Sequence, residues 1–290
     1  MSSERRPVVV ITGGTGGIGY HSALGVAQAG ARVVITGRNL ARGEAARQRL
    51  MAASGNDAIE LVIGDLSSIA GIDALAEALL RRLDRVDVLV NNAGYLGSVL
   101  VKSEDGLEMH FAVNVLAPRR LTLSLLPALC AAPSARVLNV TGGDKPGAVD
   151  VDNLQAEKGF KGLMTYTHSK SVMEAMSVGL ALELAPQSVM VNVVFPGRAS
   201  TAMTRSLSLS TLPGAMKLML PVFKLFFAED GGKSAARAAR STIWGVTTPD
   251  LEGVSGCYFD TNSEEKRMHA TAYDAAVQAR IVSLISAAGG

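Results

Sequence analysis

Tyr166 and Lys170 have the residue types and the spacing for acid–base chemistry. They stand four positions apart, so on a helix both side chains project from the same face, one turn apart. A free tyrosine has a pKa of about 10, which is too high for proton transfer near neutrality. A nearby cation stabilises the phenolate and lowers that pKa. The pair therefore predicts a tyrosine proton donor that a lysine tunes.

A glycine-rich run near the start of the chain has the spacing of a phosphate-binding loop. It reads T-G-x-x-x-G-x-G from Thr12 to Gly19, where a strand should pass into a helix. Glycines let the backbone approach a pyrophosphate, and the first turn of a helix offers free N–H groups and a positive dipole end. The spacing differs from the G-x-G-x-x-G of the commoner dinucleotide fold. Together with the tyrosine and lysine, the run predicts hydride transfer with a nicotinamide dinucleotide.

The elements that must position these motifs alternate along the chain. Short apolar, β-branched runs indicate strands at 7–12, 32–36, 58–63, 86–91, 136–141, 189–195 and 256–259. Longer helical patterns fill the intervals at 17–29, 40–53, 69–83, 107–130, 165–185 and 232–244. This alternation predicts an α/β fold, a Rossmann-type doubly wound parallel sheet with helices on both faces. The ligand crevice should lie at the carboxyl ends of the strands.

The length and the absence of linkers favour a single domain. A chain of 290 residues can bury one large core, and α/β folds often run this long as one unit. We expect a flexible N-terminus at residues 1–6 and one domain over residues 7–290. The longest irregular stretch, about 197–228, is expected to be a substrate lid. Its richness in Met, Leu and Phe favours an apolar ligand, with membrane-surface binding and a purely structural role as alternatives.

The composition excludes several classes of protein. Aromatic residues make up only 4% of the chain and the net charge is +2, so we expect no nucleic-acid partner. No run reaches the ~20 apolar residues of a membrane span, and the first seven residues are too polar for a signal peptide. Cys130 and Cys257 match no metal-binding spacing. We therefore expect a cytoplasmic protein with no transmembrane segment and no metal site.

Further residues at the ends of the expected strands carry a resemblance to a known family. Asp65-Leu66 follows the third strand, Asn92-Ala93-Gly94 the fourth and Pro196-Gly197 the sixth. With the glycine run and Y-x-x-x-K, these motifs resemble the short-chain dehydrogenase/reductase family from about Val8 to Phe259. Within it, the chain is similar to the retinol-dehydrogenase-like branch. That similarity lies in Gly37-Arg38-Asn39 leading to Gly43-Glu44, in Asp152–Gln155 leading to Tyr166–Lys170, and in Ser255–Phe259.

The resemblance implies roles for individual residues. Asp65 and Leu66 would contact the adenine, Thr201 would hold the nicotinamide carboxamide, and Asn114 would anchor a water that continues a proton relay. The catalytic residues expected are then Tyr166, Lys170 and Asn114. The expected cofactor-binding residues are Thr12, Gly13, Thr15, Gly17, Ile18, Gly19, Arg38, Asp65, Leu66, Asn92, Ala93, Gly94, Tyr166, Lys170, Pro196, Gly197 and Thr201. The family also implies a two-fold assembly through helices 107–130 and 165–185, which leaves homodimer and homotetramer open.

Arg38 indicates which dinucleotide is bound. It falls just past the second expected strand, where the adenosine ribose should lie. An acidic residue there accepts a ribose hydroxyl, whereas an arginine pairs with a 2′-phosphate. We therefore expect NADP(H) rather than NAD(H), the alternative being a solvated surface arginine.

One position departs from the family pattern. The family normally has a serine on the fifth strand, and the sequence places Gly142 there. Thr141 precedes it and should point away from the site, unless a bulge turns it inward. We expect an oxidoreductase that acts on a sizeable apolar carbonyl or alcohol, with Tyr166 as general acid. The alternatives are reduction of an imine or an activated C=C bond, and a cofactor-binding protein with little redox turnover.

Overall fold

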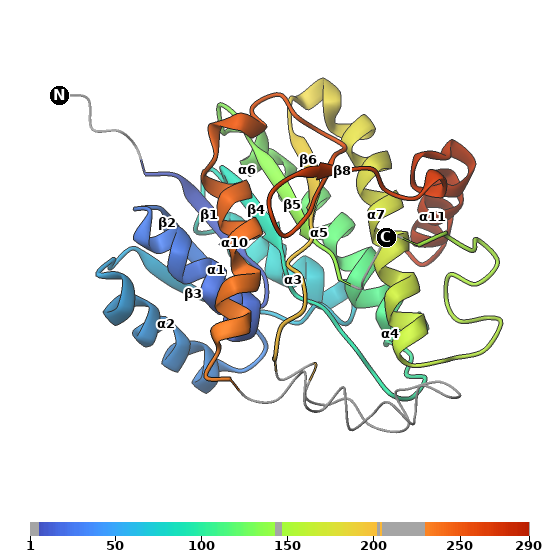
Figure 1. Cartoon of the computed structure of the whole chain (residues 1–290), viewed down its shortest axis with the longest axis horizontal. Coiled ribbons are helices and arrows are strands. Elements are labelled where there is room, and N and C mark those ends of the chain that lie inside the picture. Colours follow the sequence, from blue (N-terminus) through green and yellow to red (C-terminus); the bar gives the residue numbers. More distant parts are fainter. Residues whose placement is uncertain (1–5, 143–146, 202–203, 205–229, 290) are drawn as a thin grey trace.

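The computed structural model describes residues 6–142, 147–201, 204 and 230–289 (Figure 1). The first five residues of the expected flexible N-terminus lie outside this range. Most of the expected substrate lid, including all of 205–229, lies outside it as well. None of the helices in the described part of the chain is long and apolar enough to cross a membrane.

Among the described residues, eight strands form one sheet in the order β3-β2-β1-β4-β5-β6-β7-β8. The first seven are parallel, and β8 runs antiparallel to β7. The strands are β1 Val8–Ile11, β2 Arg32–Gly37, β3 Ile59–Ile63, β4 Val88–Asn91, β5 Arg136–Val140, β6 Met190–Val194, β7 Tyr258–Phe259 and β8 Glu265–Lys266. The strand order reverses between β1 and β4, which is the switch point where doubly wound sheets bind ligands. The Rossmann-type fold expected from the sequence is confirmed.

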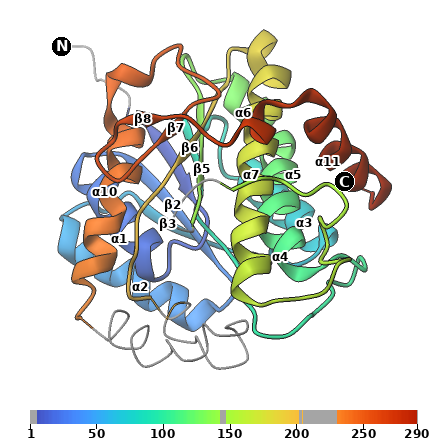
Figure 2. The same cartoon turned by 45° about the vertical axis from the view of Figure 1, so that its right-hand side comes forward.

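Helices cover both faces of the sheet (Figures 1 and 2). Helices α1, α2 and α10 lie on one face, and α3, α5 and α7 lie on the other. Their bounds are α1 Gly17–Gln28, α2 Leu40–Ser54, α3 Ile69–Leu80, α4 Met109–Phe111, α5 Ala117–Ser124, α6 Leu126–Cys130, α7 Leu163–Leu184, α10 Lys233–Thr247 and α11 Ala275–Ala287. Short 3₁₀ turns occupy Ala185–Gln187, Pro249–Leu251 and Ala270–Tyr273.

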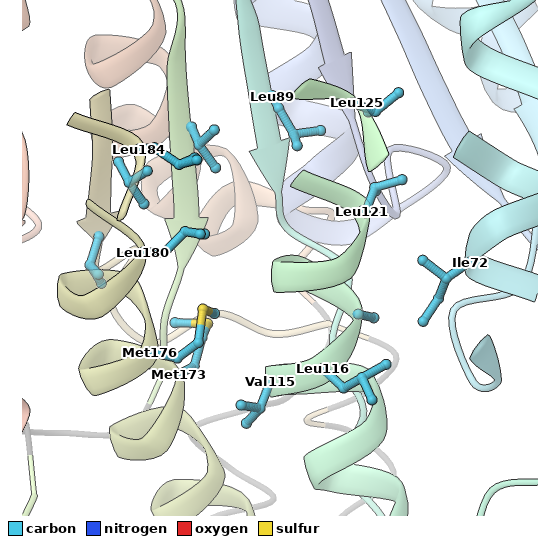
Figure 3. Packing of buried hydrophobic residues seen from close by; sticks show 14 of the residues in the cluster. Ile72, Leu89, Val115, Leu116, Leu121, Leu125, Met173, Met176, Leu180 and Leu184 are labelled. Atoms are coloured by element: carbon cyan, nitrogen blue, oxygen red, sulfur yellow. The ribbon is translucent and has the colours of Figure 1, made fainter. Parts of the chain in front are cut away.

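Alternating strand residues build two separate apolar clusters. Val9 and Ile11 of β1 face the cluster under α1 and α2, whereas Val10 faces the cluster under α3, α5 and α7. This follows from the two-residue period of a strand, which sends successive side chains to opposite faces. Figure 3 shows the second cluster, where Leu121 and Met176 reach from α5 and α7 towards the sheet. A strand that is buried on both faces therefore reads as a continuous apolar run.

The expected helix over 107–130 is broken in the structure. A π-helical turn, Ala112–Leu116, separates α4 from α5, and a further break at Leu125 separates α5 from α6. Pro118 lacks the N–H that would bond the carbonyl four residues earlier, and Pro127, the second residue of α6, lacks it in the same way. Single-turn π-bulges of this kind often mark functional sites.

Helix α11 and strand β8 were not expected from the sequence. Asp274 caps α11 by accepting hydrogen bonds from Ala276 N and Val277 N, a signal that the sequence contains. The helix packs against α7, as Figures 1 and 2 show. Val277, Ile281 and Ile285 bury their side chains in the same cluster as α7. Part of α7, one of the helices through which the family resemblance implies a two-fold assembly, is therefore covered within the chain.

The glycine run provides a test of the local backbone. Gly17 has a φ of +54°, and a Cβ there would come 3.2 Å from Thr201 Cγ2. Gly16 has an extended φ of −172°, and an added Cβ meets no described atom within 4 Å. We expect Gly17→Ala to lower the free energy of unfolding in urea by about 1–2 kcal/mol, because L residues are strained at positive φ. Gly16→Ala adds the same methyl group to an extended N-cap residue and should cost less, because only the weak N-cap preference for glycine is lost; equal losses in both variants would contradict this backbone.

Candidate active site

A cavity of about 940 Å³ opens at the carboxyl ends of the central strands. Its wall combines the glycine run, the ends of β2, β4, β5 and β6, and the first turns of α7. The predicted residues that line it are Gly13, Thr15, Gly17, Ile18, Gly19, Arg38, Asp65, Leu66, Asn92, Ala93, Gly94, Tyr166, Lys170, Pro196, Gly197 and Thr201. Thr12 and Asn114 lie behind this wall.

Thr12 joins the loops that follow β1 and β4. Its buried Oγ1 accepts hydrogen bonds from Asn92 N and Ala93 N, both at 3.0 Å, and donates to Val90 O. Asn92 Nδ2 donates in return to Thr12 O at 2.8 Å. In the structure the Thr12 side chain supports the loops beneath the cavity, and its expected role in binding a cofactor stays a prediction. The sequence did not reveal this because a strand-end threonine can turn to either face.

The glycine run fits a pyrophosphate. Helix α1 begins at Gly17 with the glycine Gly16 as its N-cap, so the N–H groups of the first turn have no capping side chain. Gly19 packs so closely under the loop that a Cβ there would collide with the Asn92 amide. Free N–H groups and the positive end of the helix dipole favour an anion at this point. The loop therefore offers a cradle for a diphosphate made from backbone alone.

Two arginines line the cavity beyond the end of β2. Arg38 follows the strand directly, and Arg42 lies in the first turn of α2. Asn39 orients that turn by accepting a hydrogen bond from Arg42 N at 2.9 Å. Sequence reasoning missed Arg42, although a second arginine four positions after Arg38 was a usable signal. Two guanidinium groups at this edge suit a phosphate, because they present paired N–H donors.

Lys170 lines the cavity and is bonded to the end of β5. Its buried Nζ donates a hydrogen bond of 3.0 Å to Val140 O, at the end of β5. Burial lowers the pKa of Lys170 to about 8, and the nearby Glu174 opposes this shift. The pKa of Tyr166 is raised to about 12, because the phenol is desolvated. The lowering expected from a lysine neighbour is therefore absent in the protein alone, and Tyr166 holds its proton throughout the physiological range.

Asn114 lies in the π-helical turn and ties three elements together. Its Oδ1 accepts from Tyr95 N at 2.8 Å, and its Nδ2 donates to Tyr95 O at 3.1 Å and to Ser169 Oγ at 2.9 Å. These bonds connect the loop after β4 to α7. The side chain is fully buried behind the cavity wall. A role in anchoring a water stays a prediction.

Gly142 faces Tyr166 directly. A Cβ built on Gly142 would overlap the Tyr166 hydroxyl and would lie 3.3 Å from Cζ. Thr141 turns the other way, and its Oγ1 donates to Glu174 Oε1 at 2.6 Å. This is the register that strand alternation predicts, with no bulge turning Thr141 inward. The space left by the missing side chain is taken by the tyrosine hydroxyl itself.

The wall beyond Tyr166 is apolar. The residues that line it are Leu96, Val101, Met109, Val113, Leu163 and Met164. Sequence reasoning missed them, because they are scattered over the loop after β4, α4, the π-helical turn and the start of α7 and follow no common pattern. An apolar wall next to the Tyr166 hydroxyl suits a substrate that is hydrophobic around a single polar atom.

The two histidines near Tyr166 serve the structure. His110 is fully buried; its Nδ1 lies 2.7 Å from Glu108 Oε1, and its Nε2 accepts from Gly97 N at 3.1 Å. His168 Nε2 accepts a hydrogen bond from Asp150 N at 3.0 Å. Each histidine thus supports a neighbouring loop through a backbone N–H. Within the described residues, no group of three His, Cys, Asp or Glu side chains could hold a metal ion.

The contact between Gly142 and Tyr166 can be tested without a substrate. We expect Gly142→Ala to lower the free energy of unfolding by about 1–3 kcal/mol, because the methyl group meets the phenolic oxygen. In a Tyr166→Phe background the same substitution should cost much less, which gives a favourable coupling of about 1 kcal/mol or more in a double-mutant cycle. Gly16→Ala with Tyr166→Phe is the matched control and should show additive effects. Additivity at Gly142 would mean that the strand end does not face Tyr166.

Known proteins resemble this chain in sequence and in fold. Residues 7–211 match the family model of short chain dehydrogenases. Mouse retinol dehydrogenase 14 is 35% identical to this chain over 269 residues, which cover 89% of this chain and 78% of the relative. Human polyprenol dehydrogenase is 32% identical over 271 residues, which cover 91% of this chain and 79% of the relative. The solved Pseudomonas aeruginosa RhlG/NADP active-site complex is 28% identical with a TM-score of 0.65, covering 93% of this chain and 98% of that one. The putative short chain dehydrogenase from Shigella flexneri complexed with NADP is 25% identical, with a TM-score of 0.65 and coverage of 88% and 97%. The chain belongs to the short-chain dehydrogenase/reductase family of oxidoreductases.

Proposed function

We propose that this protein is an NADP(H)-dependent oxidoreductase that acts on a sizeable apolar carbonyl compound or alcohol. One observation carries the proposal. The glycine run, Arg38, Tyr166 and Lys170 all line one cavity. A phosphate-binding end and a proton-donating end in one cavity suit a dinucleotide cofactor whose reactive ring meets the substrate at the tyrosine.

The residues that would hold the cofactor divide into three groups. The first-turn N–H groups of α1 bind the pyrophosphate, Arg38 and Arg42 bind a 2′-phosphate, and Lys170 holds the nicotinamide ribose. Asp65, Leu66 and Thr201 retain the adenine and carboxamide roles that the family resemblance implies. Solved relatives in complex with NADP support the choice of dinucleotide. When bound, NADPH supplies the hydride.

Tyr166 supplies the proton. Its pKa of about 12 means that the phenol is neutral at pH 7, so it can donate to a carbonyl oxygen that gains negative charge. Its hydroxyl occupies the position from which a serine at residue 142 would extend. One hydroxyl thus polarises the carbonyl and protonates the product at this strand end. A water or the substrate's own hydroxyl could add a second donor.

The substrate class follows from the wall beyond Tyr166. Leu96, Val101, Leu163 and Met164 present apolar surface there, and part of it is exposed. Two curated relatives are named for retinol and polyprenol. An imine or an activated C=C bond would meet the same wall and the same proton donor. A homodimer or homotetramer stays a prediction that the family resemblance implies.

Arg38 should distinguish NADPH from NADH. We expect Arg38→Ala to weaken NADPH binding by about 10- to 100-fold and NADH binding much less, because only NADPH carries the 2′-phosphate. Arg42→Ala should act in the same direction. Fluorescence titration with each nucleotide measures the effect, and Arg81→Ala, an exposed arginine paired with Glu77 outside the cavity, is the control. Equal losses for both nucleotides in Arg38→Ala would refute the assignment.

Tyr166 should carry the proton transfer. We expect Tyr166→Phe to reduce NADPH oxidation by at least about 100-fold and to leave NADPH affinity nearly unchanged. The assay uses a panel of apolar ketones, imines and enones. Tyr273→Phe removes a phenol outside the cavity and serves as the control. Tight NADPH binding by the wild-type protein without turnover of any compound would favour a cofactor-binding protein.

A further inference from the structure

Glu174 is a buried acidic residue that the proposed reaction does not use. It lies on α7 one turn after Lys170, and only 3% of its surface is exposed. Its Oε1 accepts the 2.6 Å hydrogen bond from Thr141 Oγ1 at the end of β5. Burial raises the pKa of Glu174 to about 7, against the opposing effects of Thr141 and Lys170. An apolar side chain would fill the same place without this desolvation penalty, so the carboxylate calls for an electrostatic explanation.

Lys170 gives that explanation. Its Nζ is buried, and the hydrogen bond from it goes to Val140 O, a neutral carbonyl. A buried ammonium with such a partner loses its proton readily, because desolvation disfavours the charged form. The charge that opposes this loss is Glu174. The two side chains contact consecutive residues of the chain, Val140 and Thr141, from the same face of α7.

We propose that Glu174 is a positioning residue of the active site: with Thr141 it anchors α7 to the end of β5, and its negative charge keeps Lys170 protonated. The anchor also fixes Gly142, the next residue, against which the Tyr166 hydroxyl packs. The effect on turnover rests on the proposed function. The electrostatic effect on Lys170 does not rest on it.

The charged and titratable groups around Glu174 define the pH window. Lys170 faces it from α7 and Tyr258 from β7, and Glu174 contributes to the raised pKa of Tyr258. The pKa of Lys170, about 8, lies below its ordinary value, and that of Glu174, about 7, lies above its own. The pair therefore attracts most strongly between about pH 7 and pH 8. Below this window Glu174 gains a proton, and above it Lys170 loses one.

Lysine side-chain NMR tests the proposal on the full chain without cofactor or substrate. Protein labelled with ¹³C at lysine Cε is titrated, and the Lys170 signal is assigned from its loss in Lys170→Met. We expect Glu174→Gln, which keeps an acceptor for Thr141 but removes the charge, to lower the Lys170 midpoint by about 1–3 pH units. Glu183→Gln is the matched control, because Glu183 lies on the same helix and pairs with Arg119. An unchanged Lys170 midpoint in Glu174→Gln overturns the proposal.

A second measurement covers the case in which Glu174→Gln does not fold. The carboxyl carbon of Glu174 is titrated in the wild-type protein and in Thr141→Val, which is nearly isosteric. We expect the Glu174 midpoint to rise in Thr141→Val, because the hydroxyl that stabilises the carboxylate is lost. Lys170→Met should raise it as well. A midpoint that moves in neither variant overturns the proposal.

The pH profile of turnover separates this inference from the proposed function. With a substrate in hand, the alkaline limb of kcat/KM in Glu174→Gln should move to lower pH together with the Lys170 midpoint. A shifted NMR midpoint with an unmoved limb would overturn the positioning role in catalysis. If the wild-type protein turns over no substrate, the proposed function fails, and the NMR titrations alone decide how Glu174 acts on Lys170.

Discussion

The contact between one face of α7 and the end of β5 is the constraint on which the site depends. Tyr166, Lys170 and Glu174 recur at every fourth position of α7. They meet Gly142, Val140 and Thr141, three consecutive residues at the end of β5. A helix face offers such a row because residues four apart lie one above the other. The strand end can contact all three side chains, because the Val140 carbonyl, the Thr141 hydroxyl and the side-chain position of Gly142 point in different directions.

Burial decides the protonation states along this row. Desolvation leaves Tyr166 neutral, weakens the hold of Lys170 on its proton, and raises the pKa of Glu174. In a medium of low dielectric these groups influence one another more strongly than they would in water. The chemistry of Tyr166 is therefore set by the shape of the packed interface as much as by the identity of its neighbours. A tyrosine and a lysine at the right spacing do not by themselves give a low phenol pKa.

The sequence predicted those features whose physical cause is local. Sequence periodicity predicted seven of the strands and the start of α7. The alternation of side chains along β5 predicted that Thr141 and Gly142 face in opposite directions. Features that depend on tertiary contacts were missed. The long apolar pattern over 107–130 predicted one helix, although Pro118 disfavours a continuous helix there. The raised pKa of Tyr166 could not be predicted, because it depends on how deeply the phenol is buried. Glu174 extends the four-residue spacing by one more turn, but only the packing shows that it meets Thr141.

Different structural elements of the cavity would bind the different parts of the cofactor and the substrate, so each could change without the others. Pyrophosphate binding would rest on the backbone N–H groups of the glycine run, so its affinity would depend on glycine conformation more than on side-chain chemistry. Preference for a 2′-phosphate would rest on Arg38 and Arg42, which lie at the edge of a different strand. Selection of the apolar substrate would rest on the loop after β4 and the start of α7. In the proposed reaction the α7–β5 contact would supply the proton donor, because it fixes the position of the Tyr166 hydroxyl beside Gly142.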